Sequence, residues 1–365
     1  MNGYDLIVVG AGIVGACCAD EAAAAGLRVA IVEPATVGGG ATACAMGHLV
    51  AMDDDPAELA LARLSLQAWE AFSELPEAEF SRCGTLWVAA SADEAAGIAA
   101  RVARINASGG EAHALDAQQL REVEPALAPD LCAGMLAPRE AVVYPPRMAQ
   151  HLVRRACARG AALHRRAVQR LGRGGAVLDD GSVLRGPVLV ATGCALPRLL
   201  PQLPLRPRKG HLVITDRYPG QLRHQVLELG YADSAHGSDG SSVAFNVQPR
   251  PTGQVLVGSS REFDVDDAAV SPPMLARMLQ RAFRFMPALR ELQAIRAWTG
   301  FRPATPDGRP YLGAVPGHAD LWVAAGHEGL GVTTAPGSAR LLLDLILGRT
   351  PAIDPAPYAP SRVLP

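Results

Sequence analysis

The sequence predicts an α/β protein that combines a parallel sheet with a second, mixed α/β region whose sheet is antiparallel. Near the N-terminus, the apolar runs 4–9 and 28–32 flank a helical stretch of small residues at 12–25. Strand, helix and strand within about 30 residues are typical of a βαβ unit, which implies a parallel sheet. Strand-like segments between 210 and 259, separated by Gly, Pro and Asp, are typical of antiparallel strands.

The first half of the chain continues with a long amphipathic helix, predicted over 57–75. Asp55 is expected to be its N-cap, because a carboxylate accepts from the free N–H groups of a first helical turn. Pro146 lies in the first turn of a later helix, where a missing N–H breaks no hydrogen bond. The other segments predicted in this part are strands 83–90, 134–136 and 142–144, and helices 92–108 and 146–159.

The second half alternates between the two patterns. The predicted antiparallel region has strands 210–215, 226–229, 242–248 and 254–259 and a helix at 272–286. The parallel pattern returns in strands 185–192 and 320–325, a Gly-rich turn at 326–333 and a helix at 338–347. We therefore expect a discontinuous first domain made of 1–80, 140–208 and 295–365, and a second domain made of 81–139 and 209–294.

Composition argues against several classes of partner. Apolar residues make up 49% of the 365 positions, charged residues 19%, and the formal net charge is −2. A nearly neutral chain lacks the strong field that attracts nucleic acid or an anionic membrane. No stretch reaches the roughly 18 uninterrupted apolar residues of a membrane span, and the run Leu6–Val9 is too short for a signal peptide. The expectation is a soluble cytoplasmic protein.

The seven cysteines argue against a disulfide framework and a metal centre. Their number is odd, their spacing is irregular, and no C-x-x-C pair occurs. Zinc and iron–sulfur sites need clustered thiolates, so no metal site is predicted. A reducing compartment is the simplest interpretation.

The strongest motif is the turn Gly10-Ala11-Gly12-Ile13-Val14-Gly15, which directly follows the first strand. In such a turn Gly10 allows a tight bend, Gly12 lets the backbone approach a pyrophosphate, and Gly15 lets the helix pack on the strand. The helix N-terminus then offers free N–H groups and a positive dipole end to phosphates. Glu33 closes the second strand 18 residues after Gly15, where an acid accepts from ribose hydroxyls. The alternative is a helix-packing glycine cluster with a chance acid.

This motif predicts a dinucleotide site but does not choose between NAD and FAD. An acid at Glu33 disfavours a 2′-phosphate, which makes NADP the poorest candidate. Two further turns are expected beside the cofactor. One is Gly38–Gly40 with Ala41 and Thr42, which can direct N–H groups and a hydroxyl at the pyrophosphate or the ribityl chain. The other is Ala191-Thr192-Gly193 at the end of a predicted strand. The alternative for each is an ordinary loop.

Four motifs then occur in one order along the chain. They are VVGAGIVGA with Glu33, VLVATGC at 188–194, WTGFRPATPDGRPYLG at 298–313, and GHEGLGVT at 326–333. The set resembles the D-amino-acid oxidase family of flavoproteins, which includes glycine oxidase, sarcosine oxidase and D-amino-acid dehydrogenases, and the resemblance covers essentially the whole chain. Segment 45–56, AMGHLVAMDDDP, is most similar to the catalytic beta subunits of bacterial D-hydroxyproline dehydrogenases.

The resemblance implies that the first domain is a Rossmann-like FAD-binding domain and that the second binds the substrate. Some relatives attach FAD covalently through a His or Cys; His48 lies later than the His of those dehydrogenases, so non-covalent FAD is expected. The residues implied to contact FAD are Gly10, Gly12, Ile13, Val14, Gly15, Glu33, Pro34, Ala41, Thr42, Met46, Gly47, His48, Val168, Ala191, Thr192, Gly193, Gly326, Gly329, Leu330, Gly331, Val332 and Thr333.

The same resemblance implies four catalytic residues. Arg302 matches the arginine that grips the substrate carboxylate, since a guanidinium pairs bidentately with a carboxylate and so orients Cα. His327 and Glu328 lie at the turn that meets the flavin ring. His48 replaces an apolar residue of glycine oxidase and is placed to touch the substrate or its ring hydroxyl. Glycine oxidases carry a second basic residue where this chain has Gly329.

The implied activity is oxidation of a D-amino or cyclic imino acid, such as D-hydroxyproline, D-proline, sarcosine or glycine. Hydride would pass from Cα to flavin N5 and leave an imine, with a dehydrogenase favoured over an oxidase. An electron-transfer partner subunit and a homo- or hetero-oligomer are further expectations. The alternatives are a flavin monooxygenase and a non-catalytic FAD-bound subunit. Candidate pocket residues in the second domain are Glu228, Tyr231, Phe245, Asn246, Gln248 and Arg250.

Overall fold

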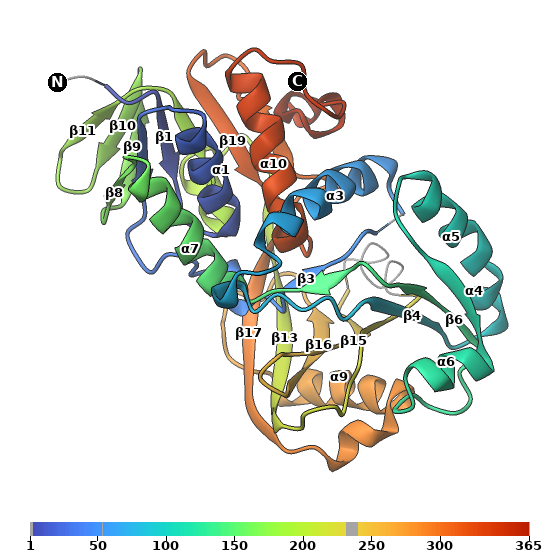
Figure 1. Cartoon of the computed structure of the whole chain (residues 1–365). Coiled ribbons are helices and arrows are strands. Elements are labelled where there is room, and N and C mark those ends of the chain that lie inside the picture. The colour runs from blue at the N-terminus through green and yellow to red at the C-terminus, as the bar shows by residue number, and fades with distance from the viewer. Residues whose placement is uncertain (1–2, 53, 231–239, 365) are drawn as a thin grey trace.

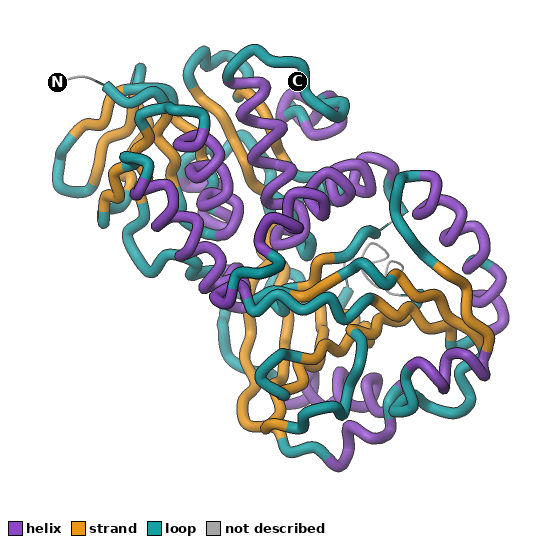
Figure 2. The backbone as a smooth tube through the Cα atoms, viewed as in Figure 1, coloured by secondary structure: helices purple, strands orange, loops and turns teal. Residues whose placement is uncertain are grey.

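The computed structural model describes residues 3–52, 54–230 and 240–364. The molecule is elongated and is built on two large sheets that lie toward opposite ends of the view in Figure 1. The tube in Figure 2 shows the strands in two groups with helices around both. One large sheet is mainly parallel and the other mainly antiparallel, which confirms the predicted fold class.

The first sheet has six strands in the order β18-β19-β12-β1-β2-β8. They are β1 (Leu6–Val9), β2 (Val29–Val32), β8 (Ala162–His164), β12 (Val188–Val190), β18 (Tyr311–Ala314) and β19 (Leu321–Ala325). All neighbours pair in parallel except β18 with β19. The central strands are apolar along their whole length and buried on both faces, as is typical of parallel sheets.

Helices cover one face of this sheet and a small antiparallel sheet covers the other. Leu6 and Val8 of β1 pack on the helices, whereas Ile7 and Val9 pack on the small sheet. The helices are α1 (Ile13–Ala24), α7 (Pro145–Ala158) and α10 (Gly331–Ile346). The small sheet consists of β9 (Val168–Gly172), β10 (Gly175–Leu178) and β11 (Val183–Arg185). The small residues of α1 let it pack between α7 and α10.

The second sheet has eight strands in the order β17-β13-β16-β15-β14-β4-β6-β5. They are β4 (Thr85–Ala89), β5 (His113–Asp116), β6 (Ala133–Ala137), β13 (Arg206–Arg217), β14 (Gln225–Glu228), β15 (Ser242–Pro249), β16 (Gln254–Arg261) and β17 (Ala294–Ala304). Its pairs are antiparallel except β4 with β14, which run parallel. That parallel pair was not predicted, because nothing in either strand's own sequence specifies its neighbour.

Helices pack on both faces of the second sheet. The helices are α4 (Ala92–Ala96), α5 (Ile98–Ala107), α6 (Ala117–Val123) and α9 (Pro272–Phe285). Alternate residues of β4 separate the two faces: Leu86 and Val88 lie in one core with α9, and Trp87 lies in another core with α5. This alternation is the period-two pattern of a strand buried on both sides.

Helix α3 (Pro56–Trp69) and a two-stranded ribbon connect the two sheets. Asp55 caps α3 by accepting from the N–H groups of Ala57 (2.7 Å) and Glu58 (3.1 Å), as predicted. The ribbon pairs β3 (His48–Leu49) with β7 (Ala141–Val142), and the short α2 (Ala41–Cys44) precedes it. Short 3-10 segments occur at Glu70–Phe72, Pro76–Ala78, Gly193–Arg198, Pro287–Glu291, Ala356–Tyr358 and Pro360–Val363.

Several boundaries differ from those predicted. Helix α3 ends at Trp69 rather than at 75, and the helix predicted over 92–108 divides at Gly97 into α4 and α5. The strand predicted over 185–192 is β12 alone, which begins at Val188, because Gly186 (φ 142°) and Pro187 separate it from β11, which ends at Arg185. Helix α10 begins at Gly331, seven residues before the predicted start. The strands β5, β8, β9, β10, β17 and β18 and the helix α6 were not predicted.

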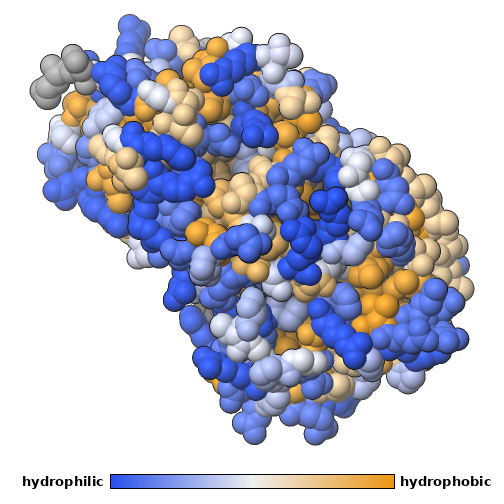
Figure 3. Space-filling model, in the orientation of Figure 1, coloured by the Kyte–Doolittle hydropathy of each residue, from blue (hydrophilic) through white to orange (hydrophobic). Residues whose placement is uncertain are grey.

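The surface in Figure 3 is mostly hydrophilic, with apolar residues distributed among polar ones. Within the described ranges, no helix has both the length and the apolar character needed to cross a membrane. The division of the chain into two discontinuous domains at the boundaries proposed above stays a prediction.

Candidate active site

The turn between β1 and α1 is a backbone cradle that only glycine can form. Gly10 has φ of 102°, and a Cβ at this position would lie 2.5 Å from the Ala191 carbonyl oxygen. A Cβ on Gly15 would lie 2.0 Å from the Gly10 carbonyl oxygen. Both contacts are too short for any side chain, so the spacing of these glycines is a packing requirement. The first turn of α1 therefore presents its N-terminus directly beside the end of β1.

Two side chains fix the position of this turn. The Glu33 carboxylate accepts from the N–H groups of Ala11 and Ala35, both at 2.9 Å. The Thr42 hydroxyl accepts from the Ile13 N–H at 3.0 Å and so caps the first residue of α1. Both side chains line the same cavity as Gly10 and Gly12. A carboxylate has lone pairs beyond the two used here, so Glu33 can also accept from ligand hydroxyls.

A cavity of about 670 Å³ extends from this turn to the second sheet. This volume lies within the range of small-molecule and cofactor sites. Its lining brings together residues predicted from six separate segments: Gly10, Gly12, Ile13, Val14, Glu33, Ala41, Thr42, Met46, Gly47, His48, Ala191, Thr192, Gly193, Arg302, Gly326, His327, Glu328, Gly329, Leu330, Gly331 and Val332.

Four residues predicted to contact the cofactor are not part of that lining. Gly15 packs against the Gly10 turn. Pro34 is exposed beyond β2, and Val168 packs against the core under the small sheet. Thr333 is buried and donates its hydroxyl to the His48 carbonyl at 2.8 Å, which ties α10 to β3. A cofactor contact by these four therefore stays a prediction without support from the cavity.

His48 places a neutral imidazole on the cavity wall. Burial lowers the pKa of His48 to about 4, so the ring carries no charge at neutral pH. Its Nε2 atom is buried and has no hydrogen-bond partner among the described residues. A neutral imidazole has one donor and one acceptor nitrogen, so His48 can bond a polar ligand group of either kind.

His327 lines the cavity but uses one ring nitrogen inside the protein. Its Nε2 lies 3.0 Å from the Ser338 hydroxyl of α10, and burial lowers the pKa of His327 to about 4. This bond holds the turn before α10 against the helix. The geometry favours a structural hydrogen bond for this side chain, and its catalytic role stays a prediction.

Arg302 lies on β17 with its guanidinium over a glycine of the neighbouring strand. A Cβ at Gly210 would lie 2.3 Å from Arg302 Nη1, so a larger residue on β13 would displace the guanidinium. Nη1 also donates to the Ser260 carbonyl at 3.1 Å. Strand pairing and the contact with the Ser260 carbonyl thus help to fix this side chain at the edge of the cavity.

Glu328 adds a carboxylate to a cluster of arginines. Burial raises the pKa of its carboxyl, but the charges of Arg302, Arg261 and Arg208 outweigh burial and lower it overall. Arg208 Nη1 lies 3.6 Å from Glu328 Oε1. Arg208 and Arg261 are 5% and 1% exposed, and Arg261 lines the cavity. Neither arginine was singled out from the sequence, because a charged residue at the end of a predicted strand usually faces solvent.

The candidate pocket residues of the second domain have different environments. Asn246 lines the cavity; its Nδ2 donates to Ser259 Oγ at 3.1 Å, and its buried Oδ1 has no hydrogen-bond partner among the described residues. Gln248 donates to the Met46 carbonyl at 2.9 Å and so holds the segment before His48. Three other candidates also lie outside the lining. Glu228 forms an ion pair with Arg281, and Arg250 forms one with Glu79. The ring of Phe245 stacks on that of Phe285. Tyr231 lies outside the described residues.

Comparison with known proteins identifies the family. A sequence profile described as "FAD dependent oxidoreductase" (DAO) matches residues 5–345. The chain belongs to this family of FAD-dependent oxidoreductases. The resemblance to the D-amino-acid oxidase family is thereby confirmed, and so is FAD as the cofactor. The narrower similarity to D-hydroxyproline dehydrogenase subunits stays a prediction.

Individual relatives of this FAD-dependent oxidoreductase include glycine oxidases. It is 29% identical to glycine oxidase from Geobacillus kaustophilus over 378 residues, which cover 98% of this chain and 97% of that protein. A crystal structure of that enzyme superposes with a TM-score of 0.85 over 98% of each chain. The match to Pseudomonas aeruginosa glycine oxidase is 35% identical but spans only 51% of this chain and 49% of that protein. Iminodiacetate oxidase from Chelativorans sp. BNC1 is 26% identical, with a TM-score of 0.83 over 97% and 98% of the chains.

The residues present fit FAD. The Gly10 cradle, the α1 N-terminus and Glu33 suit the pyrophosphate and ribose of its ADP half. Thr192 lines the same cavity, and its buried hydroxyl, which has no partner among the described residues, is available to a polar cofactor atom. The N-terminus of α10 at Gly331 also meets the cavity, and its N–H groups suit negative charge on a flavin ring.

Proposed function

We propose that this FAD-dependent oxidoreductase oxidises a small amino or cyclic imino acid at Cα. The observation that carries the proposal is a single cavity lined both by the nucleotide-binding turn and by Arg302. A guanidinium beside the cofactor is the group that binds a substrate carboxylate. The similarity to glycine oxidase and iminodiacetate oxidase supports the proposal, because glycine and iminodiacetate each carry an amine next to a carboxylate.

In this proposal the protein mainly binds and orients. Arg302, fixed over Gly210, holds the carboxylate, and the positive charges of Arg261 and Arg208 offset the negative charge of Glu328 beside it. The reacting amine must be neutral, so that its lone pair assists as hydride leaves Cα and an imine forms. FAD, when bound, supplies the two-electron acceptor. Leu227, Val50 and Met52 line the cavity with apolar side chains and exclude water from the reacting centre.

Among substrates, we favour a D-proline-type imino acid, with D-hydroxyproline first, and sarcosine or glycine next. His48 supports a hydroxylated ring, because this residue lines the cavity and its neutral ring has a nitrogen, Nε2, without a hydrogen-bond partner among the described residues. We further propose non-covalent FAD, a dehydrogenase rather than an oxidase, and a partner subunit that takes the electrons.

The test is anaerobic reduction of the purified protein. Cis-4-hydroxy-D-proline, D-proline, sarcosine or glycine is expected to bleach the yellow flavin absorption. Bleaching by NADPH but by none of these compounds would point instead to a monooxygenase, and a flavin that nothing bleaches would point to a non-catalytic subunit. Turnover with oxygen compared with an artificial dye separates oxidase from dehydrogenase. Acid precipitation is expected to release the flavin into the supernatant.

A further inference from the structure

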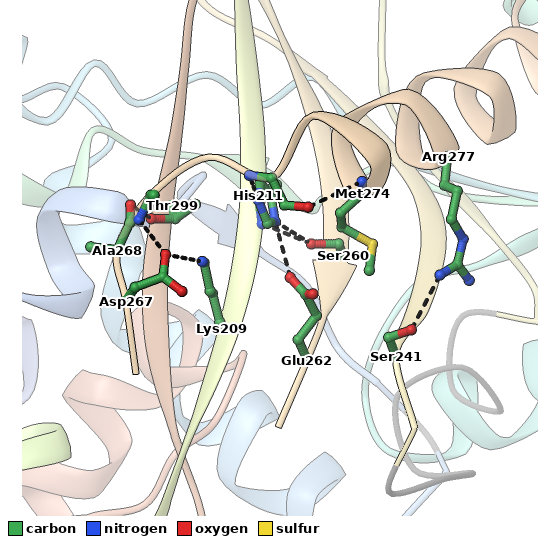
Figure 4. A network of polar contacts seen from close by, with 12 residues as sticks. Lys209, His211, Ser241, Ser260, Glu262, Asp267, Ala268, Met274, Arg277 and Thr299 are labelled. Carbon is green, nitrogen blue, oxygen red and sulfur yellow. Dashed lines mark hydrogen bonds and ion pairs between the residues drawn. The ribbon is translucent and has the colours of Figure 1, made fainter. Parts of the chain in front are cut away.

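A buried histidine next to the substrate arginine has no place in the chemistry described so far. His211 of β13 is fully buried, and Figure 4 shows it beside Ser260 and Glu262. Ser260 in turn contacts Arg302, and Ser271, which contacts the His211 ring, belongs to a loop that lines the cavity. The inference below rests on the proposed role of Arg302 in binding the substrate carboxylate.

The connection to Arg302 begins with an irregularity in strand pairing. Lys209 pairs with Glu262 and Val213 with Val257, so three residues of β13, 210–212, oppose four residues of β16, 258–261. One extra residue on β16 is a β-bulge, a feature that redirects side chains and backbone groups near active sites. Here it presents the Ser260 carbonyl to Arg302 Nη1 at 3.1 Å and Arg261 to the cavity.

His211 fills the gap that the bulge leaves in the hydrogen-bond ladder. Its backbone N–H donates to the Ser260 hydroxyl oxygen (3.0 Å) instead of to a strand carbonyl, and its Nδ1 lies 2.8 Å from the same oxygen. Ser260 is therefore held twice by one residue. Because the Ser260 carbonyl is an acceptor for Arg302, the orientation of that peptide affects where the guanidinium lies.

The other ring nitrogen of His211 fixes the tautomer. Nε2 lies 2.9 Å from the backbone N–H of Ser271, and a backbone N–H can only donate. Nε2 must therefore be the unprotonated acceptor, and Nδ1 carries the proton that it donates to Ser260. Both nitrogens of the ring are used, so His211 joins Ser260 and Ser271 through one rigid plane.

Ser271 ends a loop, residues 263–271, that forms part of the cavity wall. Ala268 of this loop and Thr299 of β17 both line the cavity. The loop is held by Thr299 Oγ1, which donates to the Ala268 carbonyl at 2.6 Å, and by Lys209 Nζ, which lies 3.1 Å from Asp267 Oδ1. Figure 4 shows these contacts next to β13, close to His211. His211 therefore contacts both Ser271 of this loop and Ser260, whose carbonyl accepts from Arg302.

The charges around His211 favour the neutral ring that this network needs. Burial lowers the pKa of His211, and the positive charges of Lys209 and Arg302 lower it further, whereas Asp267 raises it. Glu262 Oε1 lies 3.5 Å from Nδ1, beyond the closer Ser260 hydroxyl.

We propose that His211 is a positioning residue for carboxylate binding, which sets Arg302 through Ser260 and the cavity wall through Ser271. His211 is not part of the cavity lining, so we expect it to touch neither substrate nor cofactor. Nδ1 donates to Ser260 and so supports Arg302, whereas Nε2 accepts from Ser271 and so supports the loop 263–271. A substitution can therefore remove one of these two contacts and keep the other.

The experiment uses two substitutions on the FAD-bound enzyme. His211→Asn can place an amide nitrogen where Nδ1 lies and so keeps the donor to Ser260. His211→Gln can place an oxygen where Nε2 lies and so keeps the acceptor for Ser271 while losing that donor. The probe is acetate, a carboxylate without an amine, whose dissociation constant is read from the flavin spectrum. We expect His211→Gln to raise this constant and the substrate KM about tenfold, and His211→Asn to raise them less.

A double-mutant cycle distinguishes an effect that acts through Arg302 from a general disturbance of the structure. If His211 acts through Arg302, His211→Gln will raise the acetate constant in the wild-type background but not in Arg302→Lys. FAD content and Tm are measured for each variant. His224→Gln is the matched control, because His224 flanks the same sheet and contacts Glu124 away from the cavity. If neither His211 variant folds, Ser260→Ala removes the hydroxyl, keeps the carbonyl, and is expected to act like His211→Gln.

Equal acetate binding by wild type and His211→Gln would overturn the proposal, as would equal effects in the two backgrounds. The outcome for the proposed function is separate. If acetate binds wild type and depends on Arg302 but no amino or imino acid reduces the flavin, the proposed oxidation is wrong and His211 remains a positioning residue. If substrates are oxidised and His211→Gln changes nothing, only the role of His211 is wrong.

Discussion

Glu328 shows how charge is balanced at the level of single residues. Its backbone has φ of 46°, a left-handed conformation that a residue with a side chain seldom adopts, at the turn before α10. Its carboxylate stays ionised despite burial because Arg302, Arg261 and Arg208 surround it. The three arginines thus offset the negative charge of Glu328 beside Arg302, which agrees with a carboxylate substrate.

Arg302 carries the first prediction. Arg302→Lys keeps the charge but loses the planar fork, so bidentate binding of the carboxylate is lost. We expect KM to rise roughly ten- to hundredfold, as for the loss of one charged hydrogen bond, while the FAD content stays unchanged. Steady-state kinetics with the best substrate and flavin absorbance per protein measure the two quantities. Loss of FAD, or an unchanged KM, would contradict the assignment.

At the level of elements, α10 shows how packing overrides local preference. Pro336 and Gly337 predict a helix that starts after them, yet α10 runs through both. The Gly337 N–H donates to Ser65 Oγ of α3 at 2.9 Å, and the Thr333 carbonyl accepts from Trp69 Nε1 at 2.9 Å. A Cβ on Gly337 would lie 2.3 Å from Ser65 Oγ, so the missing side chain is what lets the two helices approach. Contacts with α3 thus satisfy groups that a proline and a glycine leave exposed in an isolated helix.

Ser65→Ala tests this account. The substitution leaves the buried Gly337 N–H without its side-chain acceptor, and we expect the free energy of unfolding to fall by about 1–3 kcal/mol. Denaturant unfolding of the FAD-bound protein measures the change. Ser182→Ala is the control, because Ser182 donates to Asp180 in an exposed turn and its loss is expected to change stability by about 0.5 kcal/mol or less. Equal effects of the two substitutions would refute the role of Ser65.

At the level of the whole molecule, the connection between the two sheets includes a buried acid. Glu140 precedes β7 and accepts from the Ala51 N–H at 2.7 Å, beside the cavity-lining residues Val50 and Met52. Burial raises the pKa of Glu140 to about 7, against an ordinary value of 4.5. Between about pH 4.5 and pH 7, the folded state therefore keeps a proton on Glu140 that the unfolded state releases. The resulting stabilisation is complete below pH 4.5 and is lost as the pH rises through 7.

Glu140→Gln is expected to remove this pH dependence, because the amide resembles the protonated acid. Relative to the variant, the wild type should lose about 3 kcal/mol of unfolding free energy between pH 4.5 and pH 8. Denaturant titrations at several pH values give the difference. Glu291→Gln, at an exposed position, should follow the wild type throughout. A constant difference between Glu140→Gln and wild type would show that the acid is ionised in the folded protein.

Much of the architecture could be predicted from local patterns. Apolar runs and glycine spacing predicted β1, α1 and β2, since strand burial and the Gly10 turn depend on neighbours in sequence. Asp55 as the cap of α3 is equally local. Arg302 was different: a lone arginine in a Pro-rich stretch indicates little by itself, and only the resemblance to a family singled it out.

The sequence by itself determined the α/β class, the dinucleotide turn and the family of FAD-dependent oxidoreductases. Only the tertiary structure decided which charged residues share the cavity, where α10 begins and how the β16 bulge supports Arg302. The reason is physical. A turn or a cap is specified by contacts within a few residues, whereas Arg208, Arg261 and Glu328 meet only because strands distant in sequence pair side by side.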